Sequence, residues 1–107
     1  EIVFPGEDKK PAEVFVIGCG RWGSFIAWYL DKIGHRVTLY GREHSKHMEA
    51  LQATRKNQYL TLPETIQLST SYENIHMAKY IIISSHNQMA LIYALRRLWY
   101  LCGNPSQ

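Results

Sequence analysis

The chain has 107 residues, of which 46% are hydrophobic, and a formal net charge of +3. This length suits one small domain, and this apolar content is ordinary for a folded protein rather than a disordered one. The basic residues are scattered as separate pairs, so we expect no nucleic-acid partner, although a mildly basic balance suits a phosphorylated ligand.

The first predicted unit is a strand, a helix and a second strand. Residues 1–12 mix charge, proline and glycine, so we predict a flexible leader there and a single domain over residues 13–107. The apolar run from Val14 to Ile17 predicts a buried parallel strand. Residues 36–40 alternate and are rich in residues that favour strands, which predicts the second strand.

Between these strands, residues 21–33 are predicted to form an amphipathic helix that ends before Gly34. The large apolar residues of this segment recur at helical spacing. We expect them to form one buried stripe, made of Phe25, Ile26, Tyr29, Leu30 and Ile33.

The rest of the chain continues the alternation of helices and strands. A helix is predicted from Ser45, its N-cap, to Lys56, with Met48 and Leu51 facing inward. A connector, a strand, a short helix, a strand and a final helix follow at residues 57–63, 66–69, 72–77, 79–84 and 88–101. This alternation predicts an α/β fold with a Rossmann-type, doubly wound parallel sheet.

The segment G-C-G-R-W-G, from Gly18 to Gly23, has the spacing of a dinucleotide-binding turn. Gly18 allows a tight turn, Gly20 lets the backbone approach a pyrophosphate, and Gly23 lets the helix pack close to the strand. The N-terminus of the helix offers unpaired N–H groups to the phosphates. We therefore predict that this segment, Cys19 included, binds a dinucleotide. A strand–helix corner without a ligand is the alternative.

The end of the second strand indicates which dinucleotide is preferred. An acidic residue there would bind the ribose of NAD, but this chain has Gly41 followed by Arg42. Glycine leaves space, and the arginine offers a fork of donors that suits the 2′-phosphate of NADP. This favours NADP, while the neighbouring Glu43 keeps NAD open. The alternative for Arg42 is an ordinary solvated loop arginine.

Several motifs together resemble one family. They are the G-x-G-x-W-G-S turn, the G-H-R-V-T-L-Y-G-R-E strand, the N-Q-Y-L connector with its following proline, and A-K-Y-I-I-I-S-S-H. From about Val14 to Leu98 the sequence resembles the N-terminal domain of NAD(P)-dependent glycerol-3-phosphate dehydrogenase. The tryptophan in the turn and the connector are more selective than the glycines. Ketopantoate reductase is similar around the turn but usually lacks both features.

The resemblance implies further cofactor contacts. It assigns Arg21 and Trp22, between the glycines, and Arg42, after the second strand, to the dinucleotide. Packing is the alternative for Trp22. The family has a P-S-H-like phrase after its fourth strand, which corresponds here to Ser84, Ser85 and His86, with serine in place of proline. Ser84 and His86 are therefore expected to line the cofactor, and His86 is not expected to act as an acid or base.

Members of this family continue into a helical domain with a catalytic lysine, and no lysine follows Lys79 here. We therefore expect a single truncated dinucleotide-binding domain whose catalytic C-terminal domain is absent, and no turnover by this chain alone. The resemblance implies a parent enzyme that transfers hydride between NAD(P)H and dihydroxyacetone phosphate or glycerol 3-phosphate. Two alternatives stay open: a stand-alone NAD(P)-binding or sensing module, and a fragment of a ketopantoate-reductase-like dehydrogenase.

The predicted final helix carries more apolar side chains than one face of a short sheet covers. We expect the missing catalytic domain or a second copy of the chain to cover it, which predicts a homo-oligomer. The two cysteines, Cys19 and Cys102, form no C-x-x-C pair, which predicts no metal site and a reducing, cytoplasmic compartment. No apolar run has the length of a membrane span.

Overall fold

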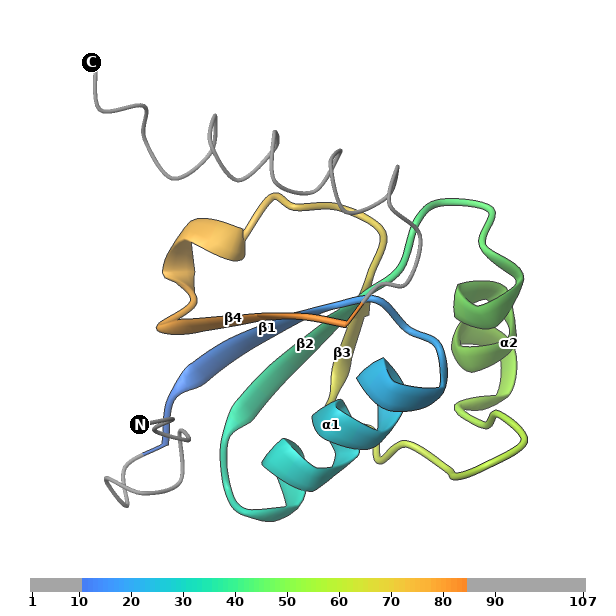
Figure 1. Cartoon of the computed structure of the whole chain (residues 1–107), viewed down its shortest axis with the longest axis horizontal. Coiled ribbons are helices and arrows are strands. Elements are labelled where there is room, and N and C mark those ends of the chain that lie inside the picture. The colour runs from blue at the N-terminus through green and yellow to red at the C-terminus, as the bar shows by residue number, and fades with distance from the viewer. Residues whose placement is uncertain (1–10, 85–107) are drawn as a thin grey trace.

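The computed structural model describes residues 11–84, which form an α/β unit around one parallel sheet (Figure 1). Its strands lie in the order β3-β2-β1-β4, and every neighbouring pair is parallel. The elements are β1 (Glu13–Ile17), α1 (Arg21–Lys32), β2 (Arg36–Tyr40), α2 (Lys46–Thr54), β3 (Gln67–Ser69), the 3-10 helix η2 (Ile75–Met77) and β4 (Tyr80–Ile83). The predicted Rossmann-type fold is confirmed.

The element boundaries follow the sequence pattern closely. The second strand covers the predicted residues, and the other strands differ from their predicted ranges by one residue at one or both ends. The predicted short helix is reduced to the single turn η2. Residues 1–10, which make up most of the predicted leader, and the predicted helix at 88–101 lie outside the described residues.

The central strand β1 is buried on both faces of the sheet, as expected for a parallel strand. Val14 and Val16 of β1 face one side, where they join Leu39 and the residues of α1 and α2 in the larger apolar cluster. Phe15 and Ile17 face the other side, where they pack with aromatic residues and with η2. Figure 1 shows α1 and η2 on opposite sides of the sheet.

The predicted buried stripe of α1 is wrong for three of its five residues. Phe25, Tyr29 and Ile33 are exposed, while Leu30 is buried. The buried face consists mainly of small residues, namely Gly23, Ser24, Ala27 and Leu30. Small side chains let the helix axis approach the sheet, so the helix turns them inward although larger apolar residues are available on its other faces.

The helix α2 is positioned by polar contacts at both of its ends. Its N-cap Ser45 accepts a hydrogen bond from the backbone N–H of Met48, as the sequence predicted. It ends at Arg55, which has a left-handed backbone, and the guanidinium of Arg55 donates to the carbonyls of Pro63 and Ile66. These bonds tie the end of α2 to the connector, residues 57–63, and to the segment before β3.

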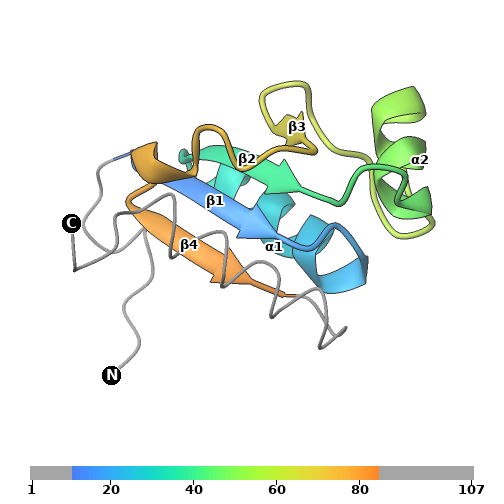
Figure 2. The same cartoon turned by 90° about the horizontal axis from the view of Figure 1, so that it is seen from above.

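The parallel arrangement brings the functional segments to one edge. Figure 2 shows the strand arrows pointing toward the edge where the chain leaves β1 for α1. The carboxyl ends of β2 and β4 pair with that of β1, through Tyr40 and Ile83 opposite Ile17. In α/β sheets ligands bind outside the carboxyl ends of the strands. The residues after β1, β2 and β4 are therefore the candidates for ligand contact.

Candidate functional site

The turn between β1 and α1 is held by backbone conformation and by a neighbouring strand. Gly18 has a φ of 108°, a backbone conformation that residues other than glycine rarely adopt. Its N–H donates to the carbonyl of Tyr40 over 2.9 Å. Gly20 is the N-cap of α1, and its carbonyl accepts the first helical bond, from the N–H of Ser24. The chain thus turns sharply from the strand end into the helix.

Gly23 and Gly20 are glycines for different reasons. A β-carbon on Gly23 would lie 1.7 Å from the carbonyl oxygen of Gly18, so the helix can pack on the turn only without a side chain there. A β-carbon on Gly20 would meet nothing within 4 Å, and its φ of −77° is open to any residue. Nothing in the described protein requires glycine at position 20. A ligand that comes close to the backbone would supply a reason, and this contact stays a prediction.

The electrostatics of the first turn of α1 favour an anion. It contains no acidic residue, and no side chain caps its N–H groups. The N–H groups at the start of a helix have no partners within the helix, and the helix dipole adds a partial positive charge there. Gly20 is the N-cap residue at this end of the helix, so the predicted place for a phosphate group is beside it.

Arg21 and Trp22 lie at the start of α1 and are both exposed. The guanidinium of Arg21 stands 4.9 Å from the centre of the Tyr59 ring and 5.5 Å from that of Trp22. Trp22 is 53% exposed and lies edge-to-face with Phe25 of the same helix, so packing in the core does not account for it. Contact of either side chain with a cofactor stays a prediction.

Cys19 lies in the same turn, but its side chain points into the core. It belongs to the larger apolar cluster, and its Sγ lies 3.9 Å from the hydroxyl of Ser45. Burial raises the pKa of the Cys19 thiol above its ordinary value, against smaller opposing effects of the Ser45 hydrogen bond and the charge of Arg42. The thiol is therefore neutral near pH 7. The predicted contact with a cofactor would involve the Cys19 backbone.

The structure shows a packing reason for glycine at position 41. A β-carbon there would lie 2.4 Å from Sγ of Cys19 and 2.9 Å from Cε of Met48. The position of a β-carbon is therefore taken by the protein's own side chains, and contact of Gly41 with a cofactor stays a prediction. This packing lets α2 and the glycine turn approach the end of β2.

Arg42 follows directly and is exposed at the same edge of the sheet. Among residues 11–84 no acidic partner lies within ion-pair distance of it, whereas the Glu43 carboxylate lies 3.9 Å from the ring nitrogen of His44. An uncommitted guanidinium at the end of β2 is available to an anionic ligand. Its preference for a 2′-phosphate stays a prediction.

Ser84 follows β4 and fixes the turn from the other side. Its hydroxyl lies within donating distance of two carbonyl oxygens, 3.2 Å from that of Ile17 and 3.3 Å from that of Gly18. Its side chain is therefore used to hold the end of β1, and its contact with a cofactor stays a prediction. His86, the remaining predicted site residue, lies outside the described residues.

The side chains of Asn57 and Ser24 also reach the turn, and neither residue was among the predicted site residues. The amide of Asn57 donates to the hydroxyl of Ser24 over 2.8 Å, and that hydroxyl donates to the carbonyl of Gly20 over 2.7 Å. In the sequence, the N-Q-Y-L segment that contains Asn57 stands out only as a family motif. The role of Asn57 depends on its contact with Ser24, which lies 33 positions away in the chain.

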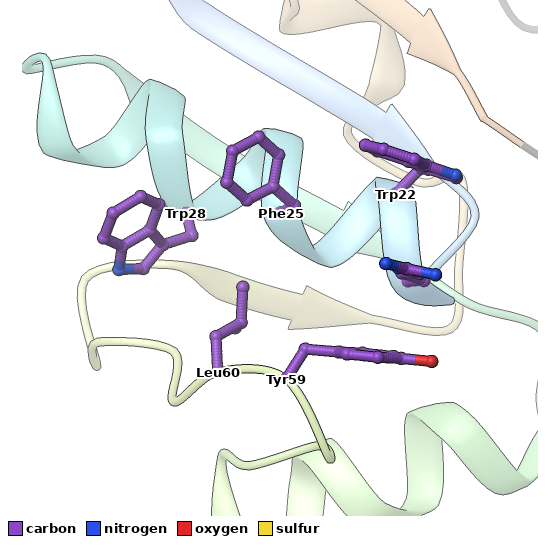
Figure 3. Close-up of a pocket in the computed structure, with 6 residues that line it drawn as sticks. Trp22, Phe25, Trp28, Tyr59 and Leu60 are labelled. Atoms are coloured by element: carbon purple, nitrogen blue, oxygen red, sulfur yellow. The ribbon is translucent and has the colours of Figure 1, made fainter.

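The connector and α1 enclose a groove beside the glycine turn. It has a volume of about 450 Å³ and is lined by Arg21, Trp22, Phe25, Trp28, Tyr59 and Leu60. Figure 3 shows Tyr59 and Leu60 of the connector facing the aromatic side chains of α1. The groove therefore puts aromatic side chains beside the first turn of α1.

Within residues 11–84, no helix is long and apolar enough to cross a membrane. The same residues hold no group of three or more histidine, cysteine, aspartate or glutamate side chains that suits a metal ion. His44 and His47 are both exposed.

Comparison with known proteins identifies a family. The family model described as NAD-dependent glycerol-3-phosphate dehydrogenase N-terminus matches residues 13–95. A glycerol-3-phosphate dehydrogenase [NAD(P)+] of Pectobacterium atrosepticum is 35% identical over 86 residues, which cover 74% of this chain and 25% of that protein. The enzyme of the same name from Yersinia pestis is 31% identical over 96 residues, covering 83% and 28%.

The chain thus spans about a quarter of the length of the curated relatives that it matches. The family match covers the strand–turn–helix unit, the connector and the fourth strand, which are the segments that build the site. This family is described as NAD-dependent, which implies a dinucleotide cofactor. The chain therefore belongs to the family of N-terminal, NAD-binding domains of glycerol-3-phosphate dehydrogenase.

Proposed function

We propose that residues 13–107 are the cofactor-binding domain of an enzyme that transfers hydride between NAD(P)H and dihydroxyacetone phosphate or glycerol 3-phosphate. The observation that supports it most is the opening over Gly20, where the protein itself gives no reason for a glycine. The family match and the names of the relatives supply the substrate class.

The chain contributes binding and orientation. The N–H groups of the first turn of α1 would hold the pyrophosphate, and Gly20 would let it approach the backbone. Arg21 and Trp22 would border the same opening. The nicotinamide of the bound dinucleotide supplies the hydride, while the protein fixes its position. The proposal assigns no catalytic base to this chain.

We further propose that NADP(H) is preferred over NAD(H). The guanidinium of Arg42 is exposed at the end of β2 and has no acidic partner among the described residues. A free guanidinium offers several donors to a 2′-phosphate, which only NADP carries. Glu43, the residue that would favour NAD, is one position further from the strand.

We also propose a protein partner and a compartment for this domain. The partner is a catalytic domain or a second copy of the chain, and the compartment is the cytoplasm. The fourth strand gives the nearest structural support for a partner, because the side chains of Tyr80 to Ile83 are only half buried.

Titration of the chain with NADPH and NADH, followed by cofactor fluorescence, tests the proposal. Gly20→Val puts a branched side chain into the opening and is expected to abolish binding. Ala53→Val, on the exposed face of α2, adds a similar bulk away from the turn and serves as the control. Undiminished affinity in Gly20→Val would remove the site, and absence of binding by the unmodified chain would remove the proposed function.

A further inference from the structure

The connector meets the first turn of α1 through one buried polar contact. Ser24 of α1 is 0% exposed, and a buried hydroxyl requires partners. It accepts a hydrogen bond from the side-chain amide of Asn57 over 2.8 Å. It lies within donating distance of two carbonyl oxygens, 2.7 Å from that of Gly20 and 3.1 Å from that of Arg21.

The direction of this hydrogen-bond chain is fixed by the connector. The Oδ1 atom of Asn57 accepts from the backbone N–H groups of Tyr59 and Leu60, over 2.8 Å and 2.9 Å. Because both of these partners are donors, the atom facing Ser24 must be the amide nitrogen, which only donates. The Ser24 hydroxyl receives that bond, so its own hydrogen is directed to the carbonyls of the helix.

Those carbonyls belong to the peptide units whose N–H groups open the helix. A trans peptide bond is planar, so its C=O and its N–H point in opposite directions. Fixing the carbonyl of Gly20 therefore fixes the N–H of Arg21, and fixing the carbonyl of Arg21 fixes the N–H of Trp22. These N–H groups lie at the helix N-terminus, where they have no partner within the helix.

We propose that Asn57 is a positioning residue for the dinucleotide, acting through the hydroxyl of Ser24 to aim the first N–H groups of α1 at the pyrophosphate. The inference rests on the proposed cofactor binding and adds a specific residue to it. It also gives the N-Q-Y-L connector a physical role, since this segment holds the phosphate-binding turn in place through Ser24.

The test uses two substitutions that change the contact without removing the elements around it. Asn57→Asp keeps the oxygen that accepts from Tyr59 and Leu60 but replaces the donor to Ser24 with an acceptor. Ser24→Ala removes the hydroxyl and leaves a residue that favours helix. Gln58→Ala, in the same connector and with an exposed side chain, is the matched control.

The ligand for the titration is ADP-ribose, which carries the pyrophosphate without the nicotinamide. We expect each single substitution to weaken binding about fivefold, as for the loss of one hydrogen bond, and Gln58→Ala to leave it unchanged. Because both residues act in one chain of bonds, the double variant is expected to bind as weakly as either single variant. The amide proton shifts of Arg21 and Trp22 are expected to move in the free single variants.

Unchanged affinity in both single variants would overturn the inference. So would additive losses in the double variant, because they would mean that the two side chains act separately, for instance through the charge that aspartate adds. Unmoved amide shifts together with a lower melting temperature would show a role in stability alone. If the unmodified chain bound neither ADP-ribose nor NADPH, the proposed function itself would fail, which is a different result.

Discussion

Replacing Gly23 with alanine is expected to destabilise the domain, because the helix α1 touches the glycine turn at that residue. The added β-carbon would lie 1.7 Å from the carbonyl oxygen of Gly18 and 2.7 Å from the hydroxyl oxygen of Ser84. The serine side chain can rotate away, but the carbonyl belongs to the backbone of the turn. The start of the helix must therefore move away from β1.

The structure sets the size of this effect. Contacts of a β-carbon below 3.0 Å are essentially absent from proteins, so the distance to Gly18 must grow from 1.7 Å to at least 3.0 Å. A forced backbone shift of this kind costs about 1–3 kcal/mol. Alanine favours a helix over glycine by about 1 kcal/mol, but the shift also loosens the contacts of Ala27 and Leu30 with the sheet. We therefore expect a net loss of about 2 kcal/mol.

Urea unfolding followed by circular dichroism measures this loss, and Gly20→Ala is the matched comparison. The β-carbon on Gly20 meets no atom within 4 Å, so this variant is expected to be as stable as the original chain or more so. A loss of about 2 kcal/mol in Gly23→Ala corresponds to a melting temperature lower by roughly 10 °C. Substitutions of the two glycines are thus expected to have different effects: those of Gly23 lower stability, and those of Gly20 lower cofactor affinity.

Equal stability of the Gly23→Ala variant and the original chain would refute this reasoning, because it would mean that the close contact between helix and turn is not present in solution. A large loss of stability in Gly20→Ala would refute the other half, since it would show that the position over the helix N-terminus is not open.

Three further outcomes are expected. Arg42→Ala should weaken NADPH by about 1.5–3 kcal/mol and NADH much less, and equal losses in fluorescence titrations would show that Arg42 does not contact the 2′-phosphate. Burial raises the pKa of the Cys19 thiol above its ordinary value of 9.0, so the unfolded chain ionises first and stability should fall as the pH rises above about that value. Unfolding of Cys19→Ala should lack this part of the alkaline loss, and an identical pH profile would contradict the assignment. Ser84→Ala should cost about 1 kcal/mol in urea unfolding, since it removes the hydroxyl that holds the carbonyls of Ile17 and Gly18, and no change would show that this hydroxyl is dispensable.

The sequence alone determined the order of the elements and the form of the glycine turn. Apolar runs such as Val14 to Ile17 and the alternation at residues 36–40 are local patterns with a period that distinguishes strand from helix. The glycine spacing acts over six consecutive residues, so it predicted the tight turn at Gly18 and the close packing of Gly23 without any knowledge of distant contacts.

The tertiary structure decided which face of α1 is buried. This helix has apolar residues on more than one side, so its pattern does not define a single inward face. The close approach at Gly23 fixes its rotation, which turns Ala27 and Leu30 to the sheet and leaves Phe25 and Tyr29 exposed. Large side chains cannot enter a contact that is only wide enough for small ones.

The tertiary structure also decided what surrounds the site. Gly41 is needed because Cys19 and Met48, from two other segments, fill the space beside it. The hydroxyl of Ser24 is held by Asn57, which lies 33 residues further along the chain. Such contacts depend on how the connector folds back over α1, and no local period in the sequence carries that information.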